Sequence, residues 1–318
     1  MDAVIDDVSP QPVEGNSVAS PSMPLLVLLL VAFGAAAIVA FAAWHYPAGI
    51  APPSPSVAAA KVVGREIGHH NRLRGVLKSR LNPEVATGLA LTLALGAVLV
   101  GGLVIGALAY LVRTNSELLR LDASVAQWGA DHAGPVSERG LSLITQLGET
   151  WFVVLLALVV YVVAYLRRPS HWIPIFLVTV LVGQWLLTNG IKELLDRVRP
   201  TLNPIAETLG PSFPSGHTTT AAAFYAAAAL VLGRGVRPHG RALLAGTAAG
   251  IAVAVACTRI FLDVHWLTDT VAGLFLGWAW FAVCAIAFGG RFLRFGAVAE
   301  EAVHEADLEK QRVAARAA

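Results

Sequence analysis

Long runs of apolar residues alternate with short polar segments along most of this chain. A helix that crosses a bilayer needs about 20 apolar residues, with a lower limit of roughly 17. The runs are continuously apolar and do not alternate with polar residues, which favours helices over barrel strands. Seven stretches reach or approach the required length, at residues 25–44, 85–112, 150–166, 172–190, 217–233, 242–258 and 270–289.

The composition indicates the same class of protein. Of the 318 residues, 56% are hydrophobic and only 14% are charged, whereas a soluble domain is about a quarter charged. We therefore expect an all-α, polytopic membrane protein. A net charge of +2 without a basic stripe gives no reason to expect a nucleic-acid partner. Cys257 and Cys284 lie in apolar runs, so we interpret them as small buried residues.

The polar segments divide the chain into regions. The first apolar stretch has an acidic flank and no good cleavage site after it, so we interpret it as a retained anchor. The basic segment that follows is either a solvated linker or a strip along the inner membrane surface. The predicted regions are a disordered N-terminal tail at 1–22, the additional transmembrane anchor at 23–46, a Pro-rich and basic cytoplasmic linker at 47–84, a six-helix membrane domain at 85–290 and a cytoplasmic tail at 291–318.

The distribution of Lys and Arg predicts the orientation. Basic residues gather after the first, third, fifth and seventh apolar stretches, and cytoplasmic segments carry such an excess. This places the N-terminus outside the plasma membrane and the C-terminus in the cytoplasm. Gly-x-x-x-Gly pairs at 102/106, 246/250 and 273/277 let helices approach closely. They can support a homodimer, although packing within one bundle explains them more simply.

Three polar segments at the ends of apolar stretches fall on the predicted outer side. In Lys192–Pro200, Lys192 and Arg199 are seven residues apart and would share one face of a continuous helix. Cations on the outer side run against the usual charge bias, and a bound phosphate would account for them. We interpret Asp196 as a structural partner of either cation, and Arg197 as an ordinary interfacial anchor.

The second segment is Pro214–His217, at the predicted start of an Ala-rich helix. Ser215 and Gly216 therefore lie where free backbone N–H groups and the helix dipole favour an anion. Capping of the helix by Ser215 is compatible with that role. His217 opens the helix, and by itself would more often be an interfacial residue than a catalyst.

The third segment is Thr258–Asp269. His265 and Asp269 are four residues apart, so on a helix the carboxylate would fix the imidazole tautomer and leave the other nitrogen free to attack. Arg259 lies near the junction with the preceding helix, and Asp263 is interpreted as a surface group. The sequence offers no acidic cluster suited to magnesium and no Cys/His set suited to zinc, so we expect no metal and no cofactor.

Taken together, the three segments resemble the signature of the type 2 phosphatidic acid phosphatase family, which are integral membrane phosphatases. The resemblance covers about residues 85–290 and departs only at Thr258, where the family usually has Ser. It implies that Asp269 orients His265, which attacks phosphorus and forms a phosphohistidine, while His217 protonates the leaving group. It also implies a set of phosphate-binding residues: Lys192, Arg199, Ser215, Gly216 and Arg259.

The resemblance implies a metal-independent phosphatase whose partners are the bilayer and a lipid phosphate or pyrophosphate at the extracytoplasmic face. Candidate substrates are a polyprenyl pyrophosphate, phosphatidate and phosphatidylglycerol phosphate. One alternative is a lipid phosphotransferase that uses the same site. Another is a non-catalytic protein that binds anionic lipid, which would have no need for both histidines and Asp269. The segment 113–149, with Trp128 and His132, either covers the site or forms an ordinary amphipathic surface helix.

Overall fold

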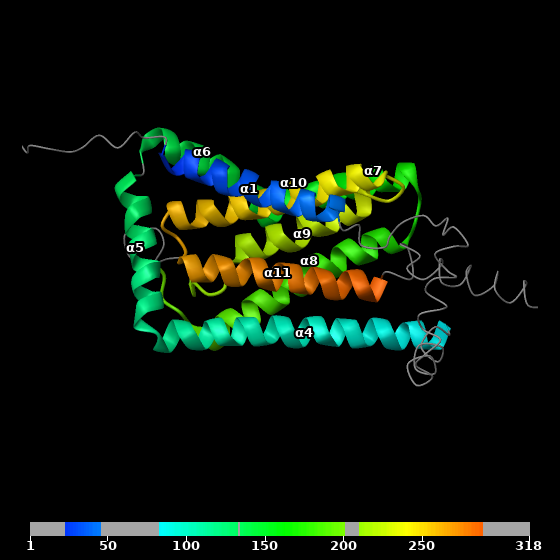
Figure 1. Cartoon of the computed structure of the whole chain (residues 1–318), viewed down its shortest axis with the longest axis horizontal. Coiled ribbons are helices and arrows are strands. Elements are labelled where there is room, and N and C mark those ends of the chain that lie inside the picture. The colour runs from blue at the N-terminus through cyan, green and yellow to red at the C-terminus, as the bar shows by residue number, and fades with distance from the viewer. Residues whose placement is uncertain (1–22, 46–82, 133, 201–209, 289–318) are drawn as a thin grey trace, which may run out of the picture.

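The computed structural model of this chain describes residues 23–45, 83–132, 134–200 and 210–288. Within these ranges every regular element is a helix, and each of the seven predicted stretches coincides with one long helix. The all-α fold class is thereby confirmed. Side by side in one bundle (Figure 1) lie α1 (Met23–His45), α4 (Pro83–Thr114), α7 (Thr150–Arg167), α8 (Trp172–Leu195), α9 (Gly216–Leu232), α10 (Pro238–Phe261) and α11 (Leu267–Phe288).

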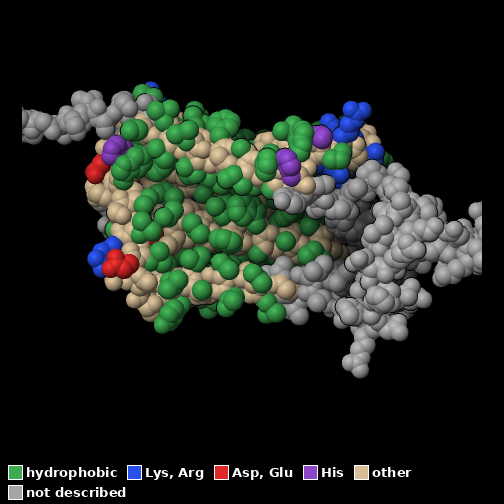
Figure 2. Space-filling model, in the orientation of Figure 1, with side chains coloured by type: hydrophobic (Ala, Val, Ile, Leu, Met, Phe, Trp, Pro, Cys, Tyr) green, Lys and Arg blue, Asp and Glu red, His purple; other side chains and the backbone are tan. Residues whose placement is uncertain are grey.

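The bundle carries the features of a membrane protein. Among the described residues, five helices are long and apolar enough to cross a bilayer, namely α1, α7, α8, α10 and α11. The sides of the bundle display large apolar side chains, and Lys and Arg gather at the end where α7 finishes (Figure 2). Residues 1–22, the linker 47–82 and the tail 291–318 lie outside the described residues.

Helix α4 ends in a sharp bend that creates a cap over one end of the bundle. The chain turns by 89° between α4 and α5 (Ser116–His132), and α5 lies across the bundle end (Figure 1). Asn115 accounts for this break, because its side-chain oxygen accepts hydrogen bonds from the Glu117 and Leu118 amides at the start of α5. The chain returns to α7 through α6 (Pro135–Thr145) and a 3₁₀ turn, η2 (Gln146–Gly148).

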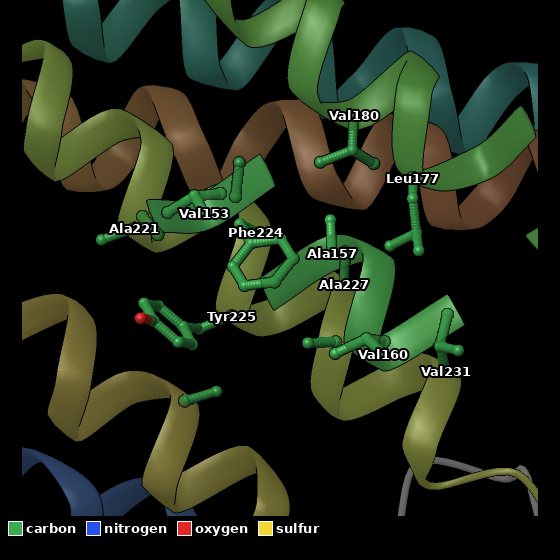
Figure 3. Close-up of a cluster of buried hydrophobic side chains, with 14 of the residues drawn as sticks. Val153, Ala157, Val160, Leu177, Val180, Ala221, Phe224, Tyr225, Ala227 and Val231 are labelled. Carbon is green, nitrogen blue, oxygen red and sulfur yellow. The ribbon is translucent and has the colours of Figure 1, made fainter. Parts of the chain in front are cut away.

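The Ala-rich helix α9 forms the centre of the bundle. Its 17 residues are mostly buried, and their small side chains let the neighbouring helices approach closely. The larger Phe224 fills the space towards α7, in the same cluster as Val153 and Ala157 (Figure 3). A tightly surrounded α9 gives its first residues a fixed position at the end of the bundle.

Two of the three Gly-x-x-x-Gly pairs pack helices within the bundle. A Cβ at Gly273 of α11 would lie 2.8 Å from the Ser215 carbonyl oxygen, so only glycine permits this approach to the start of α9. A Cβ at Gly246 of α10 would lie 2.6 Å from the Ala36 carbonyl oxygen of α1. The predicted additional anchor α1 is therefore packed directly against the core. At Gly102 in α4, a Cβ would meet nothing within 4 Å among the described residues.

Candidate active site

The three predicted segments meet at the end of the bundle next to α5. Each lies where a helix begins or ends, and hydrogen bonds join them to one another. The Ser215 amide donates to the Asp269 carbonyl oxygen at 3.0 Å. Arg199 Nη1 donates to the Val264 carbonyl oxygen at 2.6 Å. The fold thus brings together residues that are up to 77 positions apart in the chain, from Lys192 to Asp269.

His265 lies at the centre of this cluster with both ring nitrogens facing a charged group. Its Nδ1 is 3.4 Å from Asp269 Oδ2, and its Nε2 is 3.0 Å from Arg199 Nη1. Asp269 therefore lies beside the imidazole as predicted, but Nδ1 makes no hydrogen bond among the described residues. The two residues are also not on one helix, because α11 begins only at Leu267. The His265 amide donates to the Arg259 carbonyl oxygen at 3.1 Å, which fixes the loop that carries the imidazole.

Burial keeps His265 in its neutral form. Only 2% of the residue is exposed, and desolvation lowers its pKa to about 3. The Asp269 carboxylate opposes this shift, whereas Arg199 and Arg259 add to it. A proton on Nδ1 would face Asp269, and the lone pair on Nε2 would face the Arg199 guanidinium. The site therefore contains an oriented, unprotonated imidazole beside fixed cations.

The cations approach this imidazole from different elements. Arg199 is buried, and its Nε donates to the Gly210 carbonyl oxygen at 2.8 Å. Burial lowers the pKa of Arg199, which the Asp269 charge partly opposes. Arg259 donates from Nη1 to Thr145 Oγ1 at 3.0 Å, while its buried Nε has no hydrogen-bond partner among the described residues. Neutral oxygen atoms thus orient both guanidinium groups, and the positive charges of both act on His265.

The expectation that Lys192 and Arg199 share one helix is wrong. Helix α8 ends at Leu195, and Asp196 adopts a left-handed backbone with φ of 41°. The chain after Asp196 therefore leaves the helix axis, and Arg199 reaches the site from an irregular segment. Asp196 is exposed and makes no side-chain hydrogen bond or ion pair in the described part of the chain, so its predicted pairing with either cation is also wrong.

The start of α9 is arranged differently from a simple capped helix. Ser215 occupies the N-cap position, but its side chain makes no capping bond, and its Oγ accepts instead from Thr218 Oγ1 at 3.0 Å. The first backbone bond of the helix runs from the Thr219 amide to the Ser215 carbonyl oxygen. The amides of Gly216, His217 and Thr218 therefore precede the helical hydrogen-bond ladder, as an anion site requires.

His217 is oriented by two residues that sequence reasoning missed. Its Nε2 lies 3.1 Å from Oε1 of Glu149, the residue directly before α7. Gly148 permits close packing beside His217, since a Cβ there would lie 3.0 Å from the His217 carbonyl oxygen, 3.2 Å from its Cβ and 2.8 Å from Val255 Cγ1. The only hint of these two residues in the sequence is a Gly-Glu pair directly before an apolar stretch. It gives no indication of its partner, which is 68 residues away.

The interpretation of Arg197 as an interfacial anchor is wrong. Arg197 Nη1 donates to Asp269 Oδ1, and Nη2 donates to Asp122 Oδ2 of α5 at 2.8 Å. Asp122 is 1% exposed, and its other oxygen accepts from the Thr268 amide at 3.0 Å. The carboxylate beside His265 is therefore oriented through Arg197 by a residue on the capping helix, and Asp122 is a site residue that sequence reasoning missed.

Two further sequence interpretations change. Asp263, expected at the surface, is buried and has a left-handed backbone with φ of 53°. The segment 113–149 is helical, but it is more than an ordinary surface helix, because Asp122 connects it to the site. Trp128 stacks on His132 and packs against Phe261 at 5.6 Å, which attaches α5 to the end of α10.

The chain is similar to known proteins over the part that carries this cluster. A family model described as the PAP2 superfamily matches residues 171–292. A crystal structure of a transmembrane PAP2 type phosphatidylglycerolphosphate phosphatase from Bacillus subtilis superposes with a TM-score of 0.57. It is 27% identical, over 62% of this chain and 98% of that one. The region that carries the candidate site is therefore similar to the PAP2 superfamily.

Curated relatives are similar over part of the chain as well. Phosphatidylglycerophosphatase B of Bacillus subtilis is 32% identical over 139 residues, which cover 42% of this chain and 66% of that protein. Lipid A 1-phosphatase of Rhizobium etli is 34% identical over 122 residues, covering 35% of this chain and 48% of that protein. The matched family region contains all the predicted site residues, whereas Asp122 and Glu149 precede it.

The contacts of Asp122 predict a large effect on stability. Asp122→Ala leaves Arg197 with one carboxylate in a largely buried place, and breaking a buried ion pair costs about 3 kcal/mol. We expect a clear fall in the thermal unfolding midpoint of the purified protein in detergent. Glu117→Ala on the same helix is the matched control, because its pair with Arg120 is exposed and should change the midpoint little. Equal midpoints for the two variants would contradict the buried role.

Proposed function

We propose that this chain is a membrane phosphatase that removes phosphate from a lipid phosphate or pyrophosphate through a phosphohistidine intermediate. The observation that carries this proposal is the neutral His265, with Asp269 at Nδ1 and the Arg199 guanidinium at Nε2. A phosphate oxygen bound to that guanidinium would bring phosphorus close to Nε2. The names of two relatives, phosphatidylglycerophosphatase B and lipid A 1-phosphatase, support a lipid phosphate as substrate.

In the proposed first step, Nε2 of His265 attacks phosphorus in line, and the bond from phosphorus to the leaving oxygen breaks. Asp269 stabilises the positive charge that develops on the imidazole. The phosphate oxygens are bound by Lys192, Arg199 and Arg259 together with the amides at the start of α9. Phosphoryl transfer depends mainly on positioning and charge stabilisation, so an array of fixed cations is well suited to it.

His217 would serve as the general acid. Its proton passes to the leaving oxygen as that oxygen separates from phosphorus, and Glu149 Oε1 stabilises the protonated ring. In the second step His217 removes a proton from water, the water oxygen attacks phosphorus, and the bond to His265 breaks. Inorganic phosphate leaves and both histidines return to their starting states. A second lipid or a sugar in place of water would give the alternative phosphotransferase reaction.

The first test is phosphate release by the purified protein in detergent with EDTA present. Polyprenyl pyrophosphate, phosphatidate, phosphatidylglycerol phosphate and a soluble phosphate ester are compared. We expect EDTA-resistant release that falls at least about a thousandfold in His265→Ala, because the nucleophile is lost. Wild-type rates in a clean His265→Ala preparation would refute the assignment of the nucleophile. No release by folded protein, with phosphate transferred to an added lipid acceptor, would instead favour the phosphotransferase.

The role proposed for Glu149 predicts a dependence on the leaving group. Glu149→Gln keeps the size of the side chain but removes the charge beside His217 Nε2. We expect kcat/KM, which reports the first step, to fall roughly tenfold for an alkyl phosphate, whose leaving oxygen needs a proton, and to change little for p-nitrophenyl phosphate. His217→Ala should show the same selectivity more strongly. Equal losses on both esters would mean that Glu149 has only a structural role.

We also propose that the site faces the extracytoplasmic side of the plasma membrane, with the N-terminus outside and the C-terminus in the cytoplasm. Arg167, Arg168 and the turn Arg234–Arg241 lie at the end opposite α5, and cytoplasmic segments are enriched in such residues. In intact cells, an impermeant thiol reagent should label Ser116→Cys on α5 but label Arg167→Cys only after permeabilisation. The reverse pattern would invert the orientation.

A further inference from the structure

A narrow groove leads away from the site between α7, α8 and α9. It has a volume of about 130 Å³. At its outer end are Lys192, Gly216 and His217, and its walls continue along α8 through Asn189 and Thr188. Gln184 also lines the wall and lies eight positions before Lys192 in α8. This spacing corresponds to about 12 Å along the helix axis. The groove therefore extends from the phosphate-binding end of the bundle towards the middle of the membrane.

The chemistry of the site determines what occupies this groove. In an in-line displacement the leaving group departs on the side of phosphorus opposite the nucleophile. His217, the proposed general acid, must reach the leaving oxygen on that side. Because His217 borders the groove and His265 does not, the alcohol released from phosphorus lies in the groove. Trp185, which is 54% exposed on the outer surface of α8, also borders the groove, so a lipid tail can pass into the bilayer.

The groove is polar at a depth where membrane helices are usually apolar. Thr188 is 4% exposed, and its hydroxyl has no hydrogen-bond partner among the described residues. Its methyl group lies 3.9 Å from where a Cβ of Gly216 would be, so Thr188 is directly beneath the phosphate-binding turn. A buried hydroxyl without a partner reduces stability. Its presence beneath the site is explained if a substrate oxygen binds it.

A second polar pair lies deeper in the groove. Gln184 is 5% exposed, and its Nε2 donates to Thr220 Oγ1 of α9 at 3.0 Å. Both residues line the groove, so Thr220 orients the Gln184 amide, and the second hydrogen of its Nε2 can be donated to a substrate oxygen. Thr188 and Gln184 follow one another along one face of α8, as their spacing of four residues requires. Hydrogen-bonding groups therefore occur at two successive depths below the phosphate site.

We propose that this groove binds the oxygen-bearing part of the leaving alcohol, with Thr188 and Gln184 as the residues that determine specificity. The substrate is then a phosphomonoester of an alcohol with oxygen atoms close to the phosphate, such as a glycerol- or sugar-based lipid. A polyprenyl or simple alkyl chain offers no such atoms. This inference rests on the proposed phosphatase function and selects among its candidate substrates.

The test compares two lipid phosphates in the same detergent micelles, phosphatidate and hexadecyl phosphate, which differ in the oxygen atoms next to the phosphate. Thr188→Val removes the hydroxyl and keeps the shape, so the fold should be unaffected. We expect kcat/KM for phosphatidate to fall about tenfold, the effect of one lost hydrogen bond, and kcat/KM for hexadecyl phosphate to stay unchanged. Gln184→Leu should have the same selectivity.

Thr179→Val is the matched control, because the Thr179 hydroxyl on the same helix already donates to the Ile175 carbonyl oxygen at 2.7 Å. It should leave both substrates unaffected. An equal loss on phosphatidate and hexadecyl phosphate, or no loss on either, would overturn the specificity proposal while leaving the phosphatase intact. Absence of hydrolysis of both substrates by the wild-type protein would instead count against the proposed function itself.

Discussion

The ion pairs of Arg197 join three parts of this site. One guanidinium group joins Asp269 at the start of α11, Asp122 in α5 and the irregular segment after α8. Two carboxylates around one cation leave a net negative charge, which offsets part of the positive charge of Arg199 and Arg259 nearby. A buried charge is tolerated only when it is paired, so the position of α5 and the orientation of Asp269 are fixed together.

The burial of the site also explains why His265 is suited to nucleophilic attack. Desolvation favours the neutral imidazole, and the adjacent guanidinium groups oppose protonation further. In a solvent-exposed histidine, the lone pair would accept a hydrogen bond from water or bind a proton. Here the lone pair faces a cation that also attracts phosphate oxygens. In the proposed reaction, one arrangement of charge would therefore both bind the substrate and expose the nucleophile to phosphorus.

The sequence predicted the helices well because hydrophobicity along a membrane span is a local property. It also predicted His265, Asp269 and the cations as site residues from their distinctive order along the chain, and the fold brings these residues together. It could not predict Asp122 and Glu149, because each has its partner 68 or more residues away and no periodic signal marks that contact. The sequence also did not predict that α8 ends before Arg199, and the reason is different. Asp196 takes a left-handed conformation that non-glycine residues rarely adopt, and the helical spacing gave no warning of it.

The first turn of α9 shows how a helix start can be kept free for an anion. Ser215 would normally cap the helix, but its Oγ is bound by the Thr218 hydroxyl, and its carbonyl oxygen is bound by both the Thr219 amide and the Thr219 hydroxyl. The hydroxyl groups of Thr218 and Thr219 thus donate to Ser215 oxygen atoms and do not occupy the amides that precede the helical hydrogen-bond ladder. Gly273 of α11 packs against the Ser215 carbonyl oxygen and prevents the turn from relaxing. An anion can then bind rigid N–H groups without reorganising the helix, which is the condition for strong electrostatic stabilisation of a phosphoryl group.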